Sequence, residues 1–337
     1  MNYPAEKYFG KLEQVHAFYD EMPTGVSVSE TGRIFINFPK WGDEVKSTVV
    51  EIIDGELIPY PSKEANIFNI DAPDEGFLSV QSIVADGKGT LWVLDTAAPN
   101  FDATIIGGAK LVAIDLATNK IRRTYTFTKD VVLDTTYLND VRVDLRRGAE
   151  GTAYITDSSI TGPGALIVLD LSTGDAFRIL NGEHSTSVDP EFLPKVEGQI
   201  LMNRDKTGKV SPWQVAADGI ALSPDGKVLY FCPLSSRHLY SIETDLIFDK
   251  NIKANDLEKH VKDWGEKGAS DGMATAADGT IYAGDYENNS IRSINPDGTM
   301  ETIIHDPQIL WPDTLSIGPD KYLYFTSNQL QRQSGFH

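Results

Sequence analysis

The sequence is poor in cysteine and in basic residues. Cys232 is the only cysteine among 337 residues, which excludes an intramolecular disulfide and a cysteine-based zinc site. Its place in the apolar run 228–232 predicts a buried, unreactive thiol. Lys and Arg total 30 against 49 Asp and Glu, so the formal net charge is −19. Because a surface this acidic repels phosphate groups, we expect neither nucleic acid nor a membrane as a partner.

Long apolar runs are also missing. No stretch of 18 uninterrupted apolar residues occurs. Residues 1–12 contain charged residues and have no apolar stretch long enough for a signal peptide. The hydrophobic fraction of 41% is nevertheless enough for a large globular core. The sequence as written therefore predicts a soluble, cytoplasmic protein. A secreted or periplasmic protein whose signal has been removed is the alternative.

The common catalytic motifs do not occur. The sequence has no Gly-x-Ser-x-Gly, no P-loop, no Gly-x-Gly-x-x-Gly and no His-Glu-x-x-His, and its six histidines are scattered. These absences argue against Ser-His nucleophilic catalysis and against zinc chemistry.

An internal repeat organises the chain. Six segments share a pattern of strand, turn and strand, and they begin near residues 23, 81, 139, 218, 271 and 313. Asp-Gly turns between alternating strands occur in three of them. Repeats at this loose spacing are typical of propeller blades. We therefore predict an all-β fold, a six-bladed β-propeller in which residues 1–337 form a single domain.

A four-stranded blade needs a second pair of strands after each repeat. Five β-rich segments supply such pairs: residues 48–60, 110–127, 165–180, 238–248 and 290–304. No pair follows the last repeat, so we expect that blade to stay incomplete unless residues beyond His337 complete it. Residues 11–19 are expected to close the ring as an outer strand, or alternatively to form a helix.

The first residues of the inner strands are expected to meet at one mouth of the central channel. They are Thr24, Gln81, Asn139, Asp218, Asp271 and Asp313. Such convergent oxygen atoms suit a hard cation or a polar small molecule, although water-bridged polar residues also fill propeller channels. Asp95, Asp157 and Asp285 end the second strands at the same face, where a carboxylate more often holds loop amides.

Large aromatic residues lie just upstream of the inner strands. Phe77, Tyr137, Trp213, Trp264 and Trp311 are the residues that we expect to wall a ligand pocket or to pack between blades. The longest connection, residues 181–212, opens on the same face and is a candidate lid.

Four segments resemble the yellow and major royal jelly protein family, and more distantly the senescence marker protein/gluconolactonase superfamily of six-bladed, calcium-dependent lactonases. They are residues 138–144 (LNDVRVD), 218–226 (DGIALSPDG), 270–273 (SDGM) and 311–315 (WPDTL). The yellow resemblance implies a binding protein of poorly defined activity, with some members associated with aromatic amines or dopachrome isomerisation.

The lactonase resemblance implies that Asn139, Asp218 and Asp271 bind a divalent cation, calcium in that superfamily, within one coordination sphere. Three positions depart from its pattern. Thr24 stands where the lactonases have a glutamate, Asp218 where an asparagine is expected, and Tyr137 where an arginine is expected.

Three functions follow from these residues. The leading one is a lactonase-like hydrolase, in which a cation polarises the carbonyl and Asp271 acts as general base. The second is a non-catalytic protein that binds a small aromatic or cationic molecule, and the third is a tautomerase or isomerase that uses Asp218 or Asp271. The residues expected to contact the small-molecule ligand are Gln81, Tyr137, Trp213, Trp264, Trp311 and Asp313.

Overall fold

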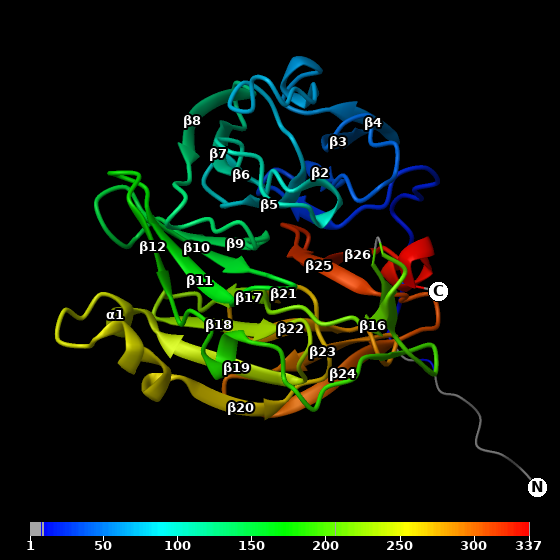
Figure 1. Cartoon of the computed structure of the whole chain (residues 1–337). Coiled ribbons are helices and arrows are strands. Elements are labelled where there is room, and N and C mark those ends of the chain that lie inside the picture. The colour runs from blue at the N-terminus through cyan, green and yellow to red at the C-terminus, as the bar shows by residue number, and fades with distance from the viewer. Residues whose placement is uncertain (1–7, 9, 206, 337) are drawn as a thin grey trace, which may run out of the picture.

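The computed structural model describes residues 8, 10–205 and 207–336 and shows an all-β propeller (Figure 1). The first blade consists of β1 (Gly25–Val28), β2 (Ile34–Asn37), β3 (Val49–Ile53) and β4 (Glu56–Pro59). The second blade consists of β5 (Val80–Ala85), β6 (Thr90–Asp95), β7 (Lys110–Asp115) and β8 (Lys120–Thr126). The third is β9 (Leu138–Asp144), β10 (Thr152–Asp157), β11 (Ala165–Asp170) and β12 (Ala176–Ile179). Each is an antiparallel four-stranded sheet.

Two further four-stranded blades follow a long connection. They are β17 (Ala217–Leu222), β18 (Val228–Pro233), β19 (His238–Glu243) and β20 (Lys262–Glu266), and β21 (Met273–Thr275), β22 (Ile281–Asp285), β23 (Ser290–Ile294) and β24 (Met300–His305). The connection itself forms two small hairpins, β13 (Lys195–Val196) with β14 (Gln199–Ile200) and β15 (Met202–Arg204) with β16 (Val210–Pro212).

The last repeat forms only a two-stranded sheet, β25 (Pro312–Ile317) with β26 (Leu323–Ser327). The ring is closed because β25 contacts both β21 and β1 (Figure 1). The prediction of six blades is thus corrected to five four-stranded blades and one two-stranded sheet. The physical reason is that the described residues after β26 form short 3-10 helices, at 330–332 and 334–336, in place of a second pair of strands.

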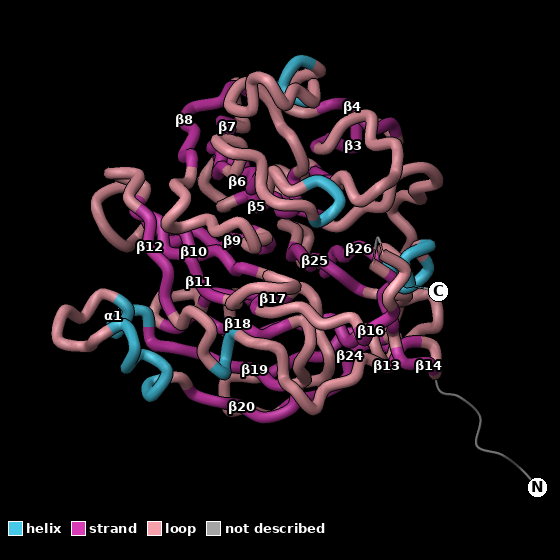
Figure 2. Tube along the Cα trace, viewed as in Figure 1, coloured by secondary structure: helices cyan, strands magenta, loops and turns pink. Residues whose placement is uncertain are grey.

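Helices are short and peripheral (Figure 2). The α-helix α1 spans Thr244–Ile247, and the other 3-10 helices are Glu64–Asn66, Pro99–Phe101, His184–Thr186 and Ala254–His260. No helix of the described residues is long and apolar enough to cross a membrane.

Residues 11–19 form neither a strand nor a helix, so both expectations for them are wrong. An outer strand needs a third strand between itself and β26, and the last sheet has none. Phe18 instead packs edge-on against Phe38, with ring centroids 5.5 Å apart, and joins an apolar cluster that includes Tyr324. The segment therefore covers the closing region of the ring by side-chain packing.

The hydrophobic core lies within and between the blades. One cluster joins the second and third blades through residues such as Leu111, Val141 and Ile167, and another joins the third and fourth. Cys232 is 0% exposed, and burial raises the pKa of its thiol. The prediction of a buried thiol is confirmed.

The inner strands approach one another very closely at two glycines. A Cβ atom added to Gly219 would lie 2.2 Å from the carbonyl oxygen of Asp271, and one added to Gly272 would lie 2.5 Å from that of Asp313. Both distances are shorter than any real Cβ contact. Because these glycines directly follow Asp218 and Asp271, the same close approach draws the aspartates of three successive inner strands together.

We predict that Gly272→Ala and Gly219→Ala each lower the free energy of unfolding by about 1–3 kcal/mol, the usual cost of overpacking. Gly335→Ala is the matched control, because its Cβ would meet only Asn203 Oδ1 at 3.5 Å. Denaturant unfolding of the three variants measures the difference. Equal stability of Gly272→Ala and Gly335→Ala would show that the strands can separate without cost.

Candidate functional site

A pocket lies where the inner strands begin. It is lined by Trp41, Gln81, Phe101, Tyr137, Asn139, Ser158, Trp213, Val215, Asp218, Leu234, Asp271, Asp313 and Leu330. The space open to the centre of a water-sized sphere is about 20 Å³, which is room for about one water molecule. The pocket is thus polar and acidic on some sides, aromatic on others, and nearly closed.

The structure brings together most of the residues singled out from the sequence. Gln81, Tyr137, Asn139, Trp213, Asp218, Asp271 and Asp313 all line this pocket. Thr24 does not, because it is 0% exposed between blades, where its Oγ1 accepts a hydrogen bond from Asn37 Nδ2 (2.9 Å). Phe77 is likewise buried in the core between the first two blades.

Trp311 lies behind the pocket and supports it. Its ring is fully buried and stacks on Tyr286 with centroids 4.2 Å apart. Its Nε1 donates a hydrogen bond to Asp271 Oδ2 (2.7 Å). Trp311 is therefore a positioning residue for Asp271, whereas the sequence predicted direct contact with the ligand.

Trp264 lies outside this pocket, away from the other predicted site residues. It lies in β20, the outer strand of its blade, where Nε1 donates to Ser241 Oγ (2.8 Å) and the ring packs beside Tyr230. The cause is an insertion: residues 244–247 form α1, so the outer strand starts only at Lys262. The segment was expected to be a loop at the mouth.

Trp41, Phe101 and Ser158 line the pocket but were missed from the sequence. All three follow the second strand of a repeat, and these strands run back to the same face as the inner-strand starts. Position after the second strand was thus a usable signal. Which of those loop residues turns inward depends on loop conformation, which the repeat pattern does not contain.

The aromatic side chains form a connected group. The Phe101 ring lies 4.8 Å from Trp41, 4.9 Å from Tyr137 and 5.7 Å from Trp213, measured between centroids. Tyr137 Oη accepts a hydrogen bond from Trp41 Nε1 (2.6 Å) and donates one to Gln81 Oε1 (2.9 Å). These contacts fix the orientation of Tyr137 and link the aromatic wall to the polar residues.

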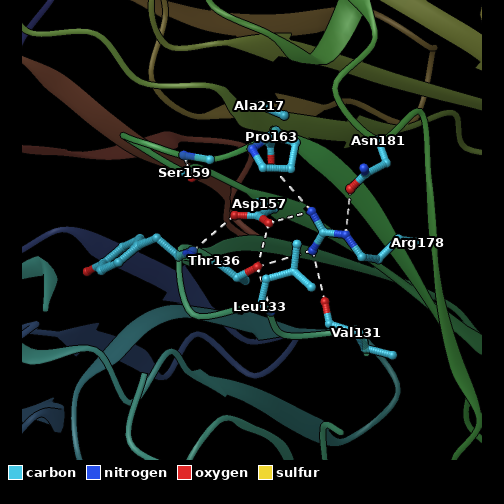
Figure 3. Close-up of polar contacts among 12 residues, drawn as sticks. Val131, Leu133, Thr136, Asp157, Ser159, Pro163, Arg178, Asn181 and Ala217 are labelled. Atoms are coloured by element: carbon cyan, nitrogen blue, oxygen red, sulfur yellow. Dashed lines mark hydrogen bonds and ion pairs between the residues drawn. The ribbon is translucent and has the colours of Figure 1, made fainter. Parts of the chain in front are cut away.

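The carboxylates at the ends of the second strands have structural roles. Figure 3 shows Asp157, which accepts hydrogen bonds from Thr136 Oγ1 (2.7 Å), the Tyr137 backbone N–H (3.0 Å) and Arg178 Nη2 (2.8 Å). Asp95 similarly accepts from the backbone N–H groups of Leu78, Ser79 and Ala97 and pairs with Lys110. Asp285 accepts from Asn288 Nδ2. They hold the loops that carry pocket residues such as Tyr137.

Three buried acids dominate the electrostatics of the pocket. Asp218, Asp271 and Asp313 are 3%, 8% and 5% exposed. Burial raises the pKa of Asp271 to about 6, although the hydrogen bond from Trp311 by itself lowers that pKa. Burial, with the charge of Asp271, raises the pKa values of Asp218 and Asp313 well above the ordinary carboxyl range. Ionising all three acids is therefore unfavourable unless a cation is bound.

Each acid has its own protein partner. Trp311 binds Asp271, Asn328 Nδ2 donates to Asp313 Oδ2 (2.6 Å), and Ser158 Oγ donates to Asp218 Oδ2 (3.0 Å). Asp218 and Asp271 also share a side-chain hydrogen bond, which contributes to the raised pKa of Asp218.

The residues present form no ready calcium site. Nowhere in the described ranges do three or more His, Cys, Asp or Glu side chains surround a point that could hold a metal ion. Calcium needs six to eight oxygen ligands, and one oxygen of each pocket aspartate already accepts a hydrogen bond from the protein. The donors are hard oxygens, but their arrangement does not fit the ion that the lactonase resemblance implied for Asn139, Asp218 and Asp271.

The sequence pattern of one family, Major royal jelly protein, matches residues 78–336. The chain belongs to the major royal jelly protein family. Protein yellow of Drosophila madeirensis is 27% identical over 257 residues, which cover 71% of this chain and 43% of that protein. Protein yellow of Drosophila melanogaster is 26% identical over 244 residues, covering 68% and 42%. This member of the family thus spans less than half the length of these relatives.

Solved structures show the same propeller fold at low sequence identity. Regucalcin from Agrobacterium tumefaciens, a calcium-binding protein, has a TM-score of 0.56 at 14% identity and covers 96% of this chain and 90% of its own. A gluconolactonase from Xanthomonas campestris has a TM-score of 0.55 at 12% identity, with 92% and 84% covered. These similarities establish the all-β propeller fold and nothing about chemistry.

The raised pKa of Asp271 predicts a pH-dependent stability. A carboxyl with an ordinary pKa of 3.8 when unfolded and about 6 when folded binds its proton more tightly in the folded protein. Its contribution is therefore fully present below the unfolded pKa and is lost as the pH rises through 6. We expect the free energy of unfolding to fall between about pH 4 and about pH 7.

Asp271→Asn should flatten this decline, while Asp225→Asn, a change of the same charge in an exposed turn, should leave it unchanged. Urea unfolding at four or five pH values in a chelating buffer measures the slopes. A decline as steep in Asp271→Asn as in the unmodified protein would contradict the assignment.

Proposed function

We propose that this chain binds a small organic amine, as its cation, in the pocket at the axial mouth. The observation that carries the proposal is the meeting of three buried carboxyl groups, those of Asp218, Asp271 and Asp313, with the aromatic rings of Trp41, Phe101, Tyr137 and Trp213 in one pocket. Carboxylates and aromatic faces both stabilise an organic cation.

The charge balance of the pocket supports this proposal. None of the described residues that line it is Lys or Arg. Arg142, a buried cation on an inner strand, lies 3.9 Å from the neighbouring Asp140 and donates to the backbone oxygen of Met273. Since burial makes the ionised acids unfavourable, a ligand that brings a positive charge relieves the desolvation cost.

A lactonase-like hydrolase is the second candidate. It is favoured by the meeting of Asn139, Asp218 and Asp271 in one pocket, and by the pKa of Asp271 at about 6, which suits a general base near neutral pH. The cation that this reaction uses in the lactonases has no ready coordination sphere here. We therefore place amine binding first.

Titration calorimetry at pH 7.5 with 2-phenylethylamine tests the proposal, with its neutral counterpart 2-phenylethanol and calcium as separate titrants. We expect 2-phenylethylamine to bind and 2-phenylethanol to bind at least tenfold more weakly. Asp218→Asn should weaken the amine by about 10-fold to 100-fold, the effect of losing a charged hydrogen bond. Asp225→Asn, in an exposed turn, should leave it unchanged.

The opposite pattern supports the hydrolase. Calcium binding without amine binding, together with hydrolysis of a lactone that stops on chelation and in Asp271→Asn, would replace our first proposal by the second.

Phe101 covers the pocket and has to move before a ring-sized ligand enters. It follows Asn100, and both residues have left-handed backbone angles, with φ of 57° and 56°. Such conformations cost about 1–3 kcal/mol each in residues other than glycine and are found at ligand clamps. The contact of Asn100 N–H with Lys40 O (2.8 Å) and the packing of Phe101 against three rings hold the loop in place.

We predict that Phe101→Ala raises both the association and the dissociation rate of 2-phenylethylamine, and changes the rates more than the affinity. Phe177→Ala, at an exposed ring on the outer strand of the third blade, is the control. Stopped-flow Trp fluorescence measures the rates. An unchanged association rate with a weaker affinity would make Phe101 a wall contact only.

A further inference from the structure

We propose that a two-part lid closes the pocket, formed by the hairpin β13–β14 and by residues 328–336, and that the side chain of Glu197 holds its two parts together. This inference goes beyond the proposed function, because it holds for any ligand of the pocket. The observation behind it is a set of contacts between two segments that are far apart in the sequence and meet beside the pocket.

Part of the lining has to move before the pocket admits a ligand, because its open space holds about one water molecule. Four lining residues lie in inner strands, within hydrogen-bonded sheets: Gln81, Asn139, Asp218 and Asp313. Leu330 differs, since it begins a short 3-10 helix outside every sheet. In the same C-terminal segment, Phe336 meets the ring of Trp213 edge to face, with centroids 5.1 Å apart, and its helix lies against β15 (Figure 1). The C-terminal segment is therefore a part of the lining that can move without breaking a sheet.

Glu197 lies at the tip of the hairpin, between β13 and β14. Its Oε1 accepts a hydrogen bond from Arg332 Nη2 (2.9 Å), and its Oε2 accepts one from Gln331 Nε2 (3.0 Å). Glu197 and Gly198 both have a positive φ, of 49° and 81°. A two-residue turn of this kind favours Asn-Gly or Asp-Gly, so a glutamate is unfavourable for the backbone here. The contact with the C-terminal segment gives this longer side chain a purpose at the tip.

The hairpin is also held at its base, independently of Glu197. The Leu201 N–H donates to Pro194 O (2.8 Å) and closes the base. The Lys195 N–H donates to Glu287 Oε1 (2.8 Å), and this carboxylate, only 8% exposed, is paired with Arg237. Loss of the contact at the tip therefore frees the tip and leaves the base in place.

The C-terminal segment has its own anchor, in the pocket itself. Asn328 Nδ2 donates to Asp313 Oδ2 (2.6 Å), and Asn328 Oδ1 accepts a hydrogen bond from the Leu330 N–H (2.9 Å). Asn328 is 6% exposed, whereas the side chains of Glu197 and Arg332 are 41% and 51% exposed. Because a half-exposed ion pair contributes little to the stability of a whole fold, the contact of Glu197 is where the lid opens.

Amide hydrogen exchange tests this inference without any ligand. Glu197→Gln keeps the length of the side chain and removes its charge. We expect the amides of Leu201 and Gln333, which are bonded within the two lid segments, to exchange about twofold to tenfold faster, the effect of weakening one half-exposed charged contact. The amides of β6, in the second blade, should keep their rates. Mass spectrometry of peptides that cover residues 194–201, 329–336 and 90–95 measures the three regions.

Glu191→Gln is the matched control, because it makes the same change at an exposed glutamate of the same connection. We expect it to leave all exchange rates unchanged. Equal exchange in Glu197→Gln and Glu191→Gln overturns the inference. Faster exchange that extends to β6 also overturns it, since Glu197 would then stabilise the whole fold and not the lid.

Labelling of an introduced thiol shows whether this opening reaches the pocket. Val215 lines the pocket and lies outside both lid segments, and the native Cys232 is 0% exposed. We expect Val215→Cys to react with iodoacetamide about twofold to tenfold faster when it is combined with Glu197→Gln than with Glu191→Gln. Equal labelling rates overturn the inference. Neither measurement contains an amine, so a failure of the lid leaves the proposed function standing, and a failure of amine binding leaves the lid.

Discussion

The structure depends on how closely the inner strands approach at the channel axis. Gly219 lies against the carbonyl of Asp271 and Gly272 against that of Asp313, so each strand fits only because its neighbour has no side chain at that point. The two glycines follow Asp218 and Asp271 directly, and the fold cannot close here without crowding acidic groups. Burial then raises the pKa values of all three aspartates. The chemistry of the mouth is thus a consequence of ring closure.

A second set of carboxylates, at the ends of the second strands, surrounds the three aspartates of the inner strands. Asp157 and Asp95 are completely buried, but each is paired with a cation and accepts hydrogen bonds from backbone N–H groups of the segment that leads into the inner strand of its own blade. Paired in this way, a buried carboxylate fixes backbone positions. Asp157 thereby holds Tyr137, whose hydroxyl joins Trp41 to Gln81. The two sets of aspartates therefore have different roles. The outer set is paired with cations and orients loops, whereas the inner set has no Lys or Arg beside it in the lining of the pocket.

The repeat pattern predicted correctly that five of the six inner-strand residues meet, because alternation and turn position determine where a strand begins, but it also placed Thr24 there, which is buried beside Asn37 instead. It placed Asn139, Asp218, Asp271 and Asp313 in one pocket. Trp264 was misplaced because α1 delays the outer strand of its blade, and Phe101 was missed because its position depends on left-handed backbone angles in a loop. The alternation of apolar and polar residues predicts neither the α1 insertion nor the backbone angles of this loop. The absence of a second pair of strands in the last repeat was predicted correctly, whereas the packing of residues 11–19 could not be predicted because it depends on tertiary contacts of Phe18.

The departures from the lactonase pattern have a common electrostatic effect. Thr24 stands where the lactonases have a glutamate, and its hydroxyl accepts a hydrogen bond from Asn37. The pocket therefore has no carboxylate from this position. Tyr137, where the lactonase resemblance leads one to expect an arginine, places an aromatic ring in the pocket instead of a cation. Among the described residues, the pocket thus has buried acids with no Lys or Arg beside them in its lining, and aromatic rings of the kind that stabilise a cation. Loss of the glutamate and gain of the ring therefore act in the same direction: they shift the pocket from a set of cation-binding oxygens toward a mixed acidic and aromatic surface.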